Sequence, residues 1–347
     1  MIGNKKYLKF VTVFTLLIVL AFLGIEINGK PVTDNSKENL VLMPCGTSST
    51  EKRSDLGERF EKIFKALEDN QPLPKLCVEL HKQSIPENNV SYMVKKVPLG
   101  DTVFMRYYGI FSGILSEKLA RTFTAITISN DIDFKLKKLT QLTHHDENLV
   151  RYRAWLELAR LHLRNKNWKK AESSLSKALN ETLDNEDWKV DAHFLQAYIH
   201  LTNKKINSAL SQLETALAGD PNFVDAYVLY IRALLEASLQ KETFFSKNSC
   251  TTKLTKLMDS IDMIACVTND RHTFIHLAKS IEQLSAEQKI KSFMIGYSNL
   301  LAGNYSTVEQ HLKSLLNSKT QWKDSPCTNL LVKQIPQILE KVSTLKQ

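Results

Sequence analysis

The sequence predicts an all-α protein of consecutive helical hairpins, preceded by an N-terminal transmembrane helix. Three observations support this fold class. Apolar residues recur every three or four positions in long polar segments, as in amphipathic helices. Only 11 of the 347 residues are glycine, which disfavours a strand-and-turn protein. The segment "YRAWLELARLHLRNKNWKKAESSLSKALN" (152–180) also has the same rhythm as "DAHFLQAYIHLTNKKINSALSQLETALAGDP" (191–221).

Residues 1–27 are predicted to be a signal-anchor that stays in the membrane. Lys5, Lys6 and Lys9 precede an uncharged apolar run from Phe10 to Ile25. The run is short for a span of about 20 residues, but Lys9 can extend its ammonium group to the interface. The positive-inside rule keeps the N-terminus in the cytosol. We therefore expect a single-pass protein of the inner (cytoplasmic) membrane with a periplasmic C-terminal domain; cleavage after Ala21 would instead give a soluble secreted adaptor.

Two further regions precede the repeats. Residues 28–50 are polar and include the run "CGTSST", which is typical of a tether. Residues 51–145 are predicted to be an N-terminal helical region. Its first helix, within "SDLGERFEKIFKALEDN", places apolar residues on one stripe: Leu56, Phe60, Ile63, Phe64 and Leu67. The apolar segment 102–128 contains four charged residues and is expected to be a buried helical pair rather than a second membrane span.

Residues 146–347 are predicted to form a solenoid with a closing C-terminal helix. With Tyr152 at position one of a 34-residue unit, positions 4, 7, 8, 11, 20, 24 and 27 hold Trp155, Leu158, Ala159, His162, Ala171, Leu175 and Ala178. With Val190 at position one, positions 4, 7, 8, 11, 20, 24, 27 and 32 hold His193, Gln196, Ala197, His200, Ala209, Leu213, Ala216 and Pro221. This register resembles the tetratricopeptide repeat (TPR) family, whose unit is two antiparallel helices.

Two more segments match the TPR pattern less closely. "FVDAYVLYIRALLEASL" matches a first helix from Val224, and "KSFMIGYSNLLAGNYSTVEQHLKSLL" matches a hairpin whose turn is "AGNY". The resemblance thus covers about 152–238 and, more loosely, 289–316. "TNLLVKQIPQILEKVSTL", interrupted by Pro336, is expected to cap the last exposed face.

The TPR resemblance implies a concave groove lined by first helices. The candidate protein-binding residues at the corresponding positions are Arg153, Leu156, Arg160, Arg164, Phe194, Tyr198, Asp225 and Arg232. They predict a cationic entrance and an aromatic floor, suited to a peptide with acidic and apolar side chains. The alternative is that the arginines are solvated and the aromatic rings pack between repeats. Leu156, Arg160 and Asp225 also stand where TPR domains that clamp a peptide carboxylate have lysine or asparagine, so no such clamp is expected.

No motif for catalysis, a metal or a cofactor is recognised. "HHDE" (144–147) offers four potential metal ligands, but adjacent histidines diverge on a helix and a polar turn is expected. No GxSxG, HExxH or phosphate-binding glycine loop occurs. Three lysines of the N-terminus contribute to the net charge of +9, and no basic block with interleaved aromatic residues suggests nucleic-acid binding.

The five cysteines allow at most two disulfides in an oxidising compartment, or none. Cys250 and Cys266 flank the apolar helical pattern of "TTKLTKLMDSIDMIAC". If that helix is continuous, their separation is about 24 Å, which is too long for a disulfide bond.

These observations predict a non-catalytic, membrane-anchored scaffold or adaptor. It would bind protein partners during assembly of a cell-envelope complex of the secretion, pilus or cofactor-insertion type. The alternative is an envelope enzyme with a catalytic region around 75–143, in which the repeats recruit the substrate.

Overall fold

The computed structural model describes residues 56–71, 116–221, 223–239, 249–268, 272–317 and 326–346. These residues form α-helices and one short 3-10 helix without a strand, as the all-α prediction expects. They all belong to the larger of two units, residues 40–347. The predicted anchor (1–27) and tether (28–50) lie outside the described ranges, and no helix within those ranges is long and apolar enough to cross a bilayer.

The first described helices are α2 (Leu56–Glu68), α4 (Glu117–Ile128) and α5 (Ile132–Leu142). The predicted stripe of α2 is confirmed at Phe60, Ile63, Phe64 and Leu67, which are all buried. Helix α5 begins after Asp131, whose carboxylate accepts a hydrogen bond from the Phe134 amide at 2.9 Å. The "HHDE" segment is a turn between α5 and the next helix, as predicted.

Two consecutive hairpins follow and match the two segments that share a rhythm. Their helices are α6 (Asn148–Arg164) with α7 (Trp168–Asn180), and α8 (Val190–Thr202) with α9 (Ile206–Gly219). A short 3-10 helix, η3 (Glu186–Lys189), connects the hairpins. Each hairpin packs closely within itself, while α6 also contacts α8, so the first helices form a layer of their own.

The hairpin turns repeat one backbone geometry. In each turn one residue has a positive φ: Lys166 at 56°, Lys204 at 59° and Gly303 at 76°. The following amide donates to a carbonyl five residues earlier, for example from Asn167 to His162 at 2.8 Å. The same bond joins Lys205 to His200 and Asn304 to Asn299. This is the Schellman arrangement that ends a helix, and here it begins each return helix.

Small residues stand where the two helices of a hairpin approach closely. The predicted alanines Ala159, Ala171, Ala197 and Ala209 are all fully buried. In the later hairpin, Gly296 takes the corresponding place, and a Cβ there would lie 3.1 Å from Leu312 Cδ2. The alternation of small and large residues therefore sets the distance between helices in each hairpin.

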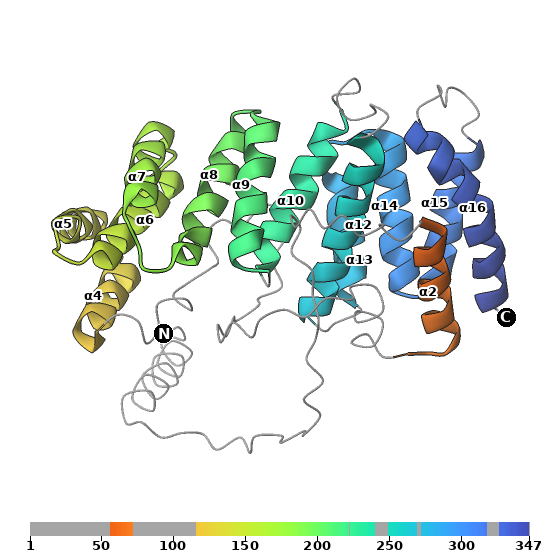
Figure 1. The fold of residues 1–347 in the computed structure, drawn as a ribbon, viewed down its shortest axis with the longest axis horizontal. Coiled ribbons are helices and arrows are strands. Elements are labelled where there is room, and N and C mark those ends of the chain that lie inside the picture. Colours follow the sequence, from red (N-terminus) through yellow and green to blue (C-terminus); the bar gives the residue numbers. More distant parts are fainter. Residues whose placement is uncertain are drawn as a thin grey trace, which may run out of the picture. The chain divides into compact units, whose positions relative to one another are not determined.

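The C-terminal helices continue the packing of antiparallel neighbours (Figure 1). They are α10 (Val224–Ala237), α12 (Ser249–Thr268), α13 (His272–Gln283), α14 (Gln288–Leu301), α15 (Tyr305–Asn317) and α16 (Pro326–Leu345). Helix α12 contacts α14 and α16 as well as its chain neighbours. Pro336 lies inside α16, the predicted closing helix.

Cys250 is buried and disulfide-bonded. Helix α12 runs unbroken through both Cys250 and Cys266, as the sequence predicted. At 1.5 Å per residue the two backbones are about 24 Å apart, so Cys266 is not its partner.

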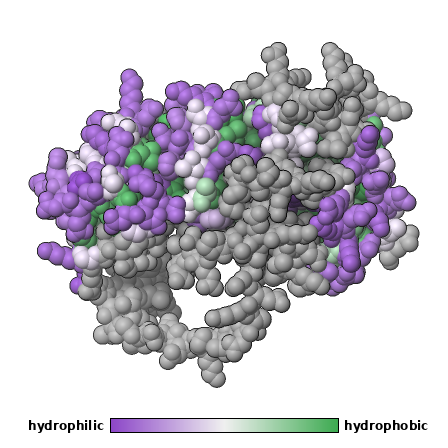
Figure 2. Space-filling view, in the orientation of Figure 1, coloured by the Kyte–Doolittle hydropathy of each residue, from purple (hydrophilic) through white to green (hydrophobic). Residues whose placement is uncertain are grey.

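The two helices of a hairpin differ in burial. In α8, buried residues occur all around the helix, whereas α7 and α9 each keep an exposed polar face. The described surface in Figure 2 is accordingly mostly hydrophilic, with apolar residues visible in narrow seams. One large core joins α2 to the helices from α6 to α16, and a smaller cluster joins α4, α5 and α6.

Candidate functional site

The structure buries half of the residues predicted to line the groove. Arg153, Leu156, Arg160 and Phe194 are at most 5% exposed. Tyr198, Asp225 and Arg232 are half-buried, and Arg164 is exposed. The predicted set is therefore not one continuous open surface, since its members divide between the packing of α6 with α8 and the surface around them.

The buried arginines belong to a network of charges between the first two hairpins. Arg153 Nη2 lies 2.9 Å from Glu157 Oε1, and Arg160 Nη1 lies 2.8 Å from the same oxygen. Arg160 Nη2 reaches across to α8, where Asp191 Oδ2 is 3.1 Å away. Burial lowers the pKa of Arg160, but the carboxylates of Glu157 and Asp191 outweigh this effect and raise it above its ordinary value. These cations are neutralised within the stack and connect one hairpin to the next.

The aromatic rings of this region also pack between helices. The Phe194 ring lies 4.9 Å from that of Phe223, the residue before α10, and both are buried. The Tyr198 ring is 6.2 Å from that of Trp168, at the start of α7. Tyr198 thus remains the half-buried aromatic side chain of the predicted floor.

A second cluster of charges, on α12 and α14, holds a separate helix. Arg59 of α2 inserts its guanidinium between the two helices, as a buried side chain. Its Nη1 lies 2.6 Å from Asp259 Oδ1, and its Nη2 pairs with the carboxylate of Asp262. Its Nε donates to the Tyr297 hydroxyl at 3.0 Å, and that hydroxyl donates to Asp262 Oδ1 at 2.9 Å. Helix α2 therefore meets α12 and α14, two helices from a distant part of the chain, at one arginine.

Burial dominates the titration of this cluster. It raises the pKa of Asp262 to about 6, against the opposing effect of Arg59. Burial also raises the pKa of Tyr297 well above its ordinary value, so its hydroxyl stays protonated and can donate to Asp262. For Arg59, burial lowers the pKa, but Tyr297, Asp262 and Asp259 together raise it. The cluster is thus arranged to hold a cation in a region that excludes water.

Aromatic contacts surround the arginine. The Phe60 ring meets those of Phe293 and Tyr297 edge to face, with centroids 6.4 and 6.0 Å apart. The Arg59 guanidinium lies 5.7 Å from the Tyr297 ring centroid. This face of α12 and α14 therefore contacts both Arg59 and Phe60, which follows it in the chain.

No family model and no curated protein matches the chain.

The arginine site was not predicted from the sequence. A signal for it exists on α12, where Asp262 falls one turn after Met258 within the predicted apolar stripe. An acid in such a position needs a cation or several hydrogen bonds to be stable there. The sequence does not show that the cation comes from Arg59, because the two residues are 203 positions apart.

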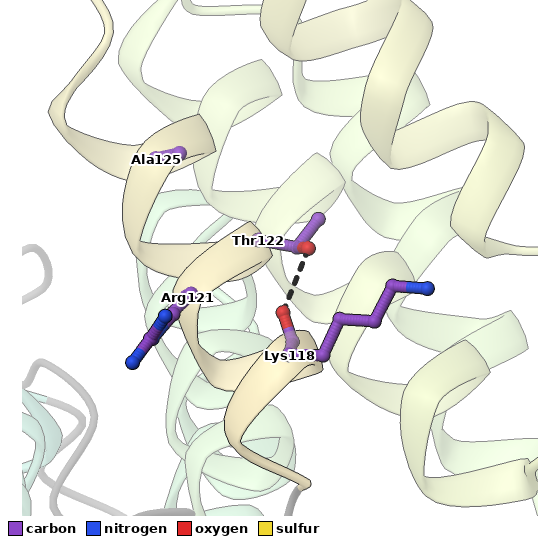
Figure 3. Close-up of a pocket in the computed structure, with 4 residues that line it drawn as sticks. All are labelled: Lys118, Arg121, Thr122 and Ala125. Carbon is purple, nitrogen blue, oxygen red and sulfur yellow. Dashed lines mark hydrogen bonds between the residues drawn. The ribbon is translucent and has the colours of Figure 1, made fainter.

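One hollow of the described surface lies on α4. It has a volume of about 430 Å³ and is lined by Lys118, Arg121, Thr122 and Ala125. Figure 3 shows that Lys118 and Arg121 point in different directions, and Thr122 donates to the Lys118 carbonyl of its own helix at 2.9 Å. Among the described residues, no group of three or more acidic, histidine or cysteine side chains could hold a metal ion.

Proposed function

We propose that this chain is a non-catalytic scaffold of the TPR type that binds protein helices on the layer of first helices. The observation that supports the proposal most directly is α2. It is a separate amphipathic helix that two neighbouring helices of the stack, α12 and α14, already hold through Arg59 and Phe60. Solenoids of helical hairpins commonly bind peptides on this layer, in agreement with such an arrangement.

We further propose that the scaffold is held at the inner membrane by residues 1–27, with the repeats in the periplasm. The disulfide of Cys250 supports an oxidising compartment, since cytosolic proteins rarely keep one. An anchor of this kind concentrates the scaffold where envelope complexes assemble. The alternative with an enzymatic region around 75–143 gains no support from 116–143, which fold as α4 and α5 and extend the stack onto α6.

Site-specific photo-crosslinking in native membranes tests the scaffold. A photoreactive residue replaces Tyr198 or Arg232, which are half-buried members of the predicted groove, or Ser176, which is exposed on α7. The proposal predicts discrete protein adducts from the first two positions and none from Ser176. Equal adducts from all three positions, or none from any, would contradict a binding role for this layer.

A further inference from the structure

Helix α2 lies far along the chain from the helices that hold it. Residues 72–115 separate its described range from that of α4, and its partners Asp259, Asp262 and Tyr297 follow Arg59 by 200 positions or more. Figure 1 places α2 with the C-terminal helices rather than beside α4, the next described helix in the chain. In its contacts, α2 therefore behaves as a ligand that the chain supplies to its own C-terminal half.

The face that holds α2 has a definite chemistry. It presents two carboxylates, Asp259 and Asp262, beside the rings of Phe293 and Tyr297. Helix α2 presents the complement, an arginine and a phenylalanine in sequence, followed one turn later by Ile63 and Phe64, which are also buried. A buried ion pair contributes little net stability compared with apolar packing, but it rejects ligands without the matching charge.

One side of α2 is not sealed. A groove of about 970 Å³ runs between α2 and α16, lined by polar residues of both helices and by Phe60, Phe64 and Ile338. Lys341 of α16 reaches Glu68 of α2 at 3.6 Å, and both side chains are about half exposed. Such an exposed ion pair contributes about 0–1 kcal/mol to the stability of the contact between α2 and α16. Helix α16 thus packs against α2 and pairs with it at the surface, whereas the carboxylates that pair with the buried Arg59 lie on α12.

We propose that this face of α12 and α14, the arginine receptor, binds a partner protein through an amphipathic helix that presents an arginine followed by an aromatic residue. Helix α2 occupies the receptor in the absence of the partner and is displaced by it. This inference rests on the proposed scaffold function and names the chemistry of the partner. Because α2 is tethered, it competes at an effective concentration that can reach the millimolar range. A partner helix must therefore bind better than α2, or α2 must be released first.

A peptide of residues 54–71, labelled with a fluorophore, tests the receptor by fluorescence anisotropy against the purified full chain in detergent. The wild-type chain, whose receptor is filled, should bind the peptide weakly. The Arg59→Glu chain should bind it at least tenfold more tightly, because its own α2 no longer competes. The Lys65→Glu chain is the matched control: the same charge reversal on an exposed residue of α2 should leave the affinity at the wild-type value. A peptide that carries Arg59→Glu should bind none of the three chains.

The proposal fails if the Arg59→Glu chain keeps its helical circular dichroism yet binds the peptide no better than wild type, since α2 would then be a fixed part of the fold. If Arg59→Glu does not reach wild-type helical content, Arg59→Gln removes the charge without reversing it and takes its place. Sedimentation adds a second test. If the wild-type chain is a dimer and the Arg59→Glu chain is a monomer, a second copy of the chain fills the receptor. This result would overturn the proposal that the receptor binds a different protein. The crosslinking test of the scaffold function probes Tyr198 on α8, not the receptor on α12 and α14. Protein adducts at Tyr198 without peptide binding to the receptor would therefore reject the receptor and leave the scaffold function standing.

Discussion

Two buried arginine clusters lie in the part of the chain that the structure describes, and they differ in where their arginines originate. In the cluster of α6 and α8, Arg160 pairs with Glu157 of its own helix and with Asp191 of the next hairpin, 31 residues away. In the cluster of α12 and α14, Arg59 belongs to a helix whose arginine precedes its partners by 200 positions or more. The first cluster can open only when adjacent hairpins separate. The second can open when one helix leaves.

Under the receptor proposal, the same local chemistry serves two purposes. Between neighbouring hairpins, a buried ion pair fixes how one repeat stacks on the next. On α12 and α14, it selects which helix is bound. The difference therefore lies in the connection of the chain, and it leads to different expected responses to mutation.

The largest effect is expected from Arg160→Ala. Glu157 and Asp191 are only 8% and 3% exposed. The substitution removes one of the two arginines that neutralise these buried carboxylates. Breaking such a pair costs about 3–5 kcal/mol of unfolding free energy, because the carboxylates cannot regain water while the hairpins stay together. Urea denaturation measures the loss. Lys169→Ala, on an exposed residue of α7, is the control and should change stability by about 0.5 kcal/mol or less.

A smaller effect is expected from Arg59→Ala. The cost of leaving Asp262 unpaired cannot exceed the free energy of docking α2, because release of α2 returns the carboxylate to water. We expect about 1–2 kcal/mol in urea denaturation, together with faster hydrogen exchange in α2. A loss as large as that of Arg160→Ala would remove the distinction between the two clusters.

The pH dependence of α2 docking sharpens the comparison further. Burial raises the pKa of Asp262 to about 6 from an ordinary value of 3.8, with Arg59, Asp259 and Tyr297 facing it. The docked state thus binds the proton more tightly, and docking should weaken as pH rises from about 4 to 6 and then level off. Hydrogen exchange of α2, corrected for the intrinsic pH dependence of amides, measures this slope. Asp262→Asn should abolish it, and a slope that survives the substitution would assign it to another group.

The smallest effects concern the hairpin turns, which differ between the two halves. Lys204 adopts a positive φ in the α8–α9 turn, whereas Gly303 does so in the α14–α15 turn. Lys204→Gly should stabilise the chain by about 0.5–1 kcal/mol, because glycine has no Cβ to strain this backbone. Gly303→Ala should destabilise the chain by about 1 kcal/mol. No atom lies within 4 Å of the added Cβ, so the cost is the strain of placing alanine at a positive φ. Thermal unfolding of both variants checks the opposite signs.

The hairpins could be predicted from the sequence because their determinants are local. Apolar spacing gave the helices, and the small residues Ala159, Ala171, Ala197 and Ala209 indicated which faces meet. The binding face could be predicted less well from the sequence. Arg153 and Arg160 were expected at a groove entrance, but their carboxylate partners bury them inside the stack. Arg59 and Asp262 were missed because nothing local relates two charges 203 residues apart.

Native-state hydrogen exchange on the purified full chain is the most direct test of the central claim that α2 is an exchangeable ligand. The free energy of opening is measured for amides of α2, α6 and α8 at increasing, sub-denaturing urea. The account predicts that α2 opens at a lower free energy, with a small dependence on urea, while α6 and α8 exchange only with global unfolding. If the three helices instead share one opening free energy and one urea dependence, α2 is an integral part of the fold and the receptor proposal is wrong.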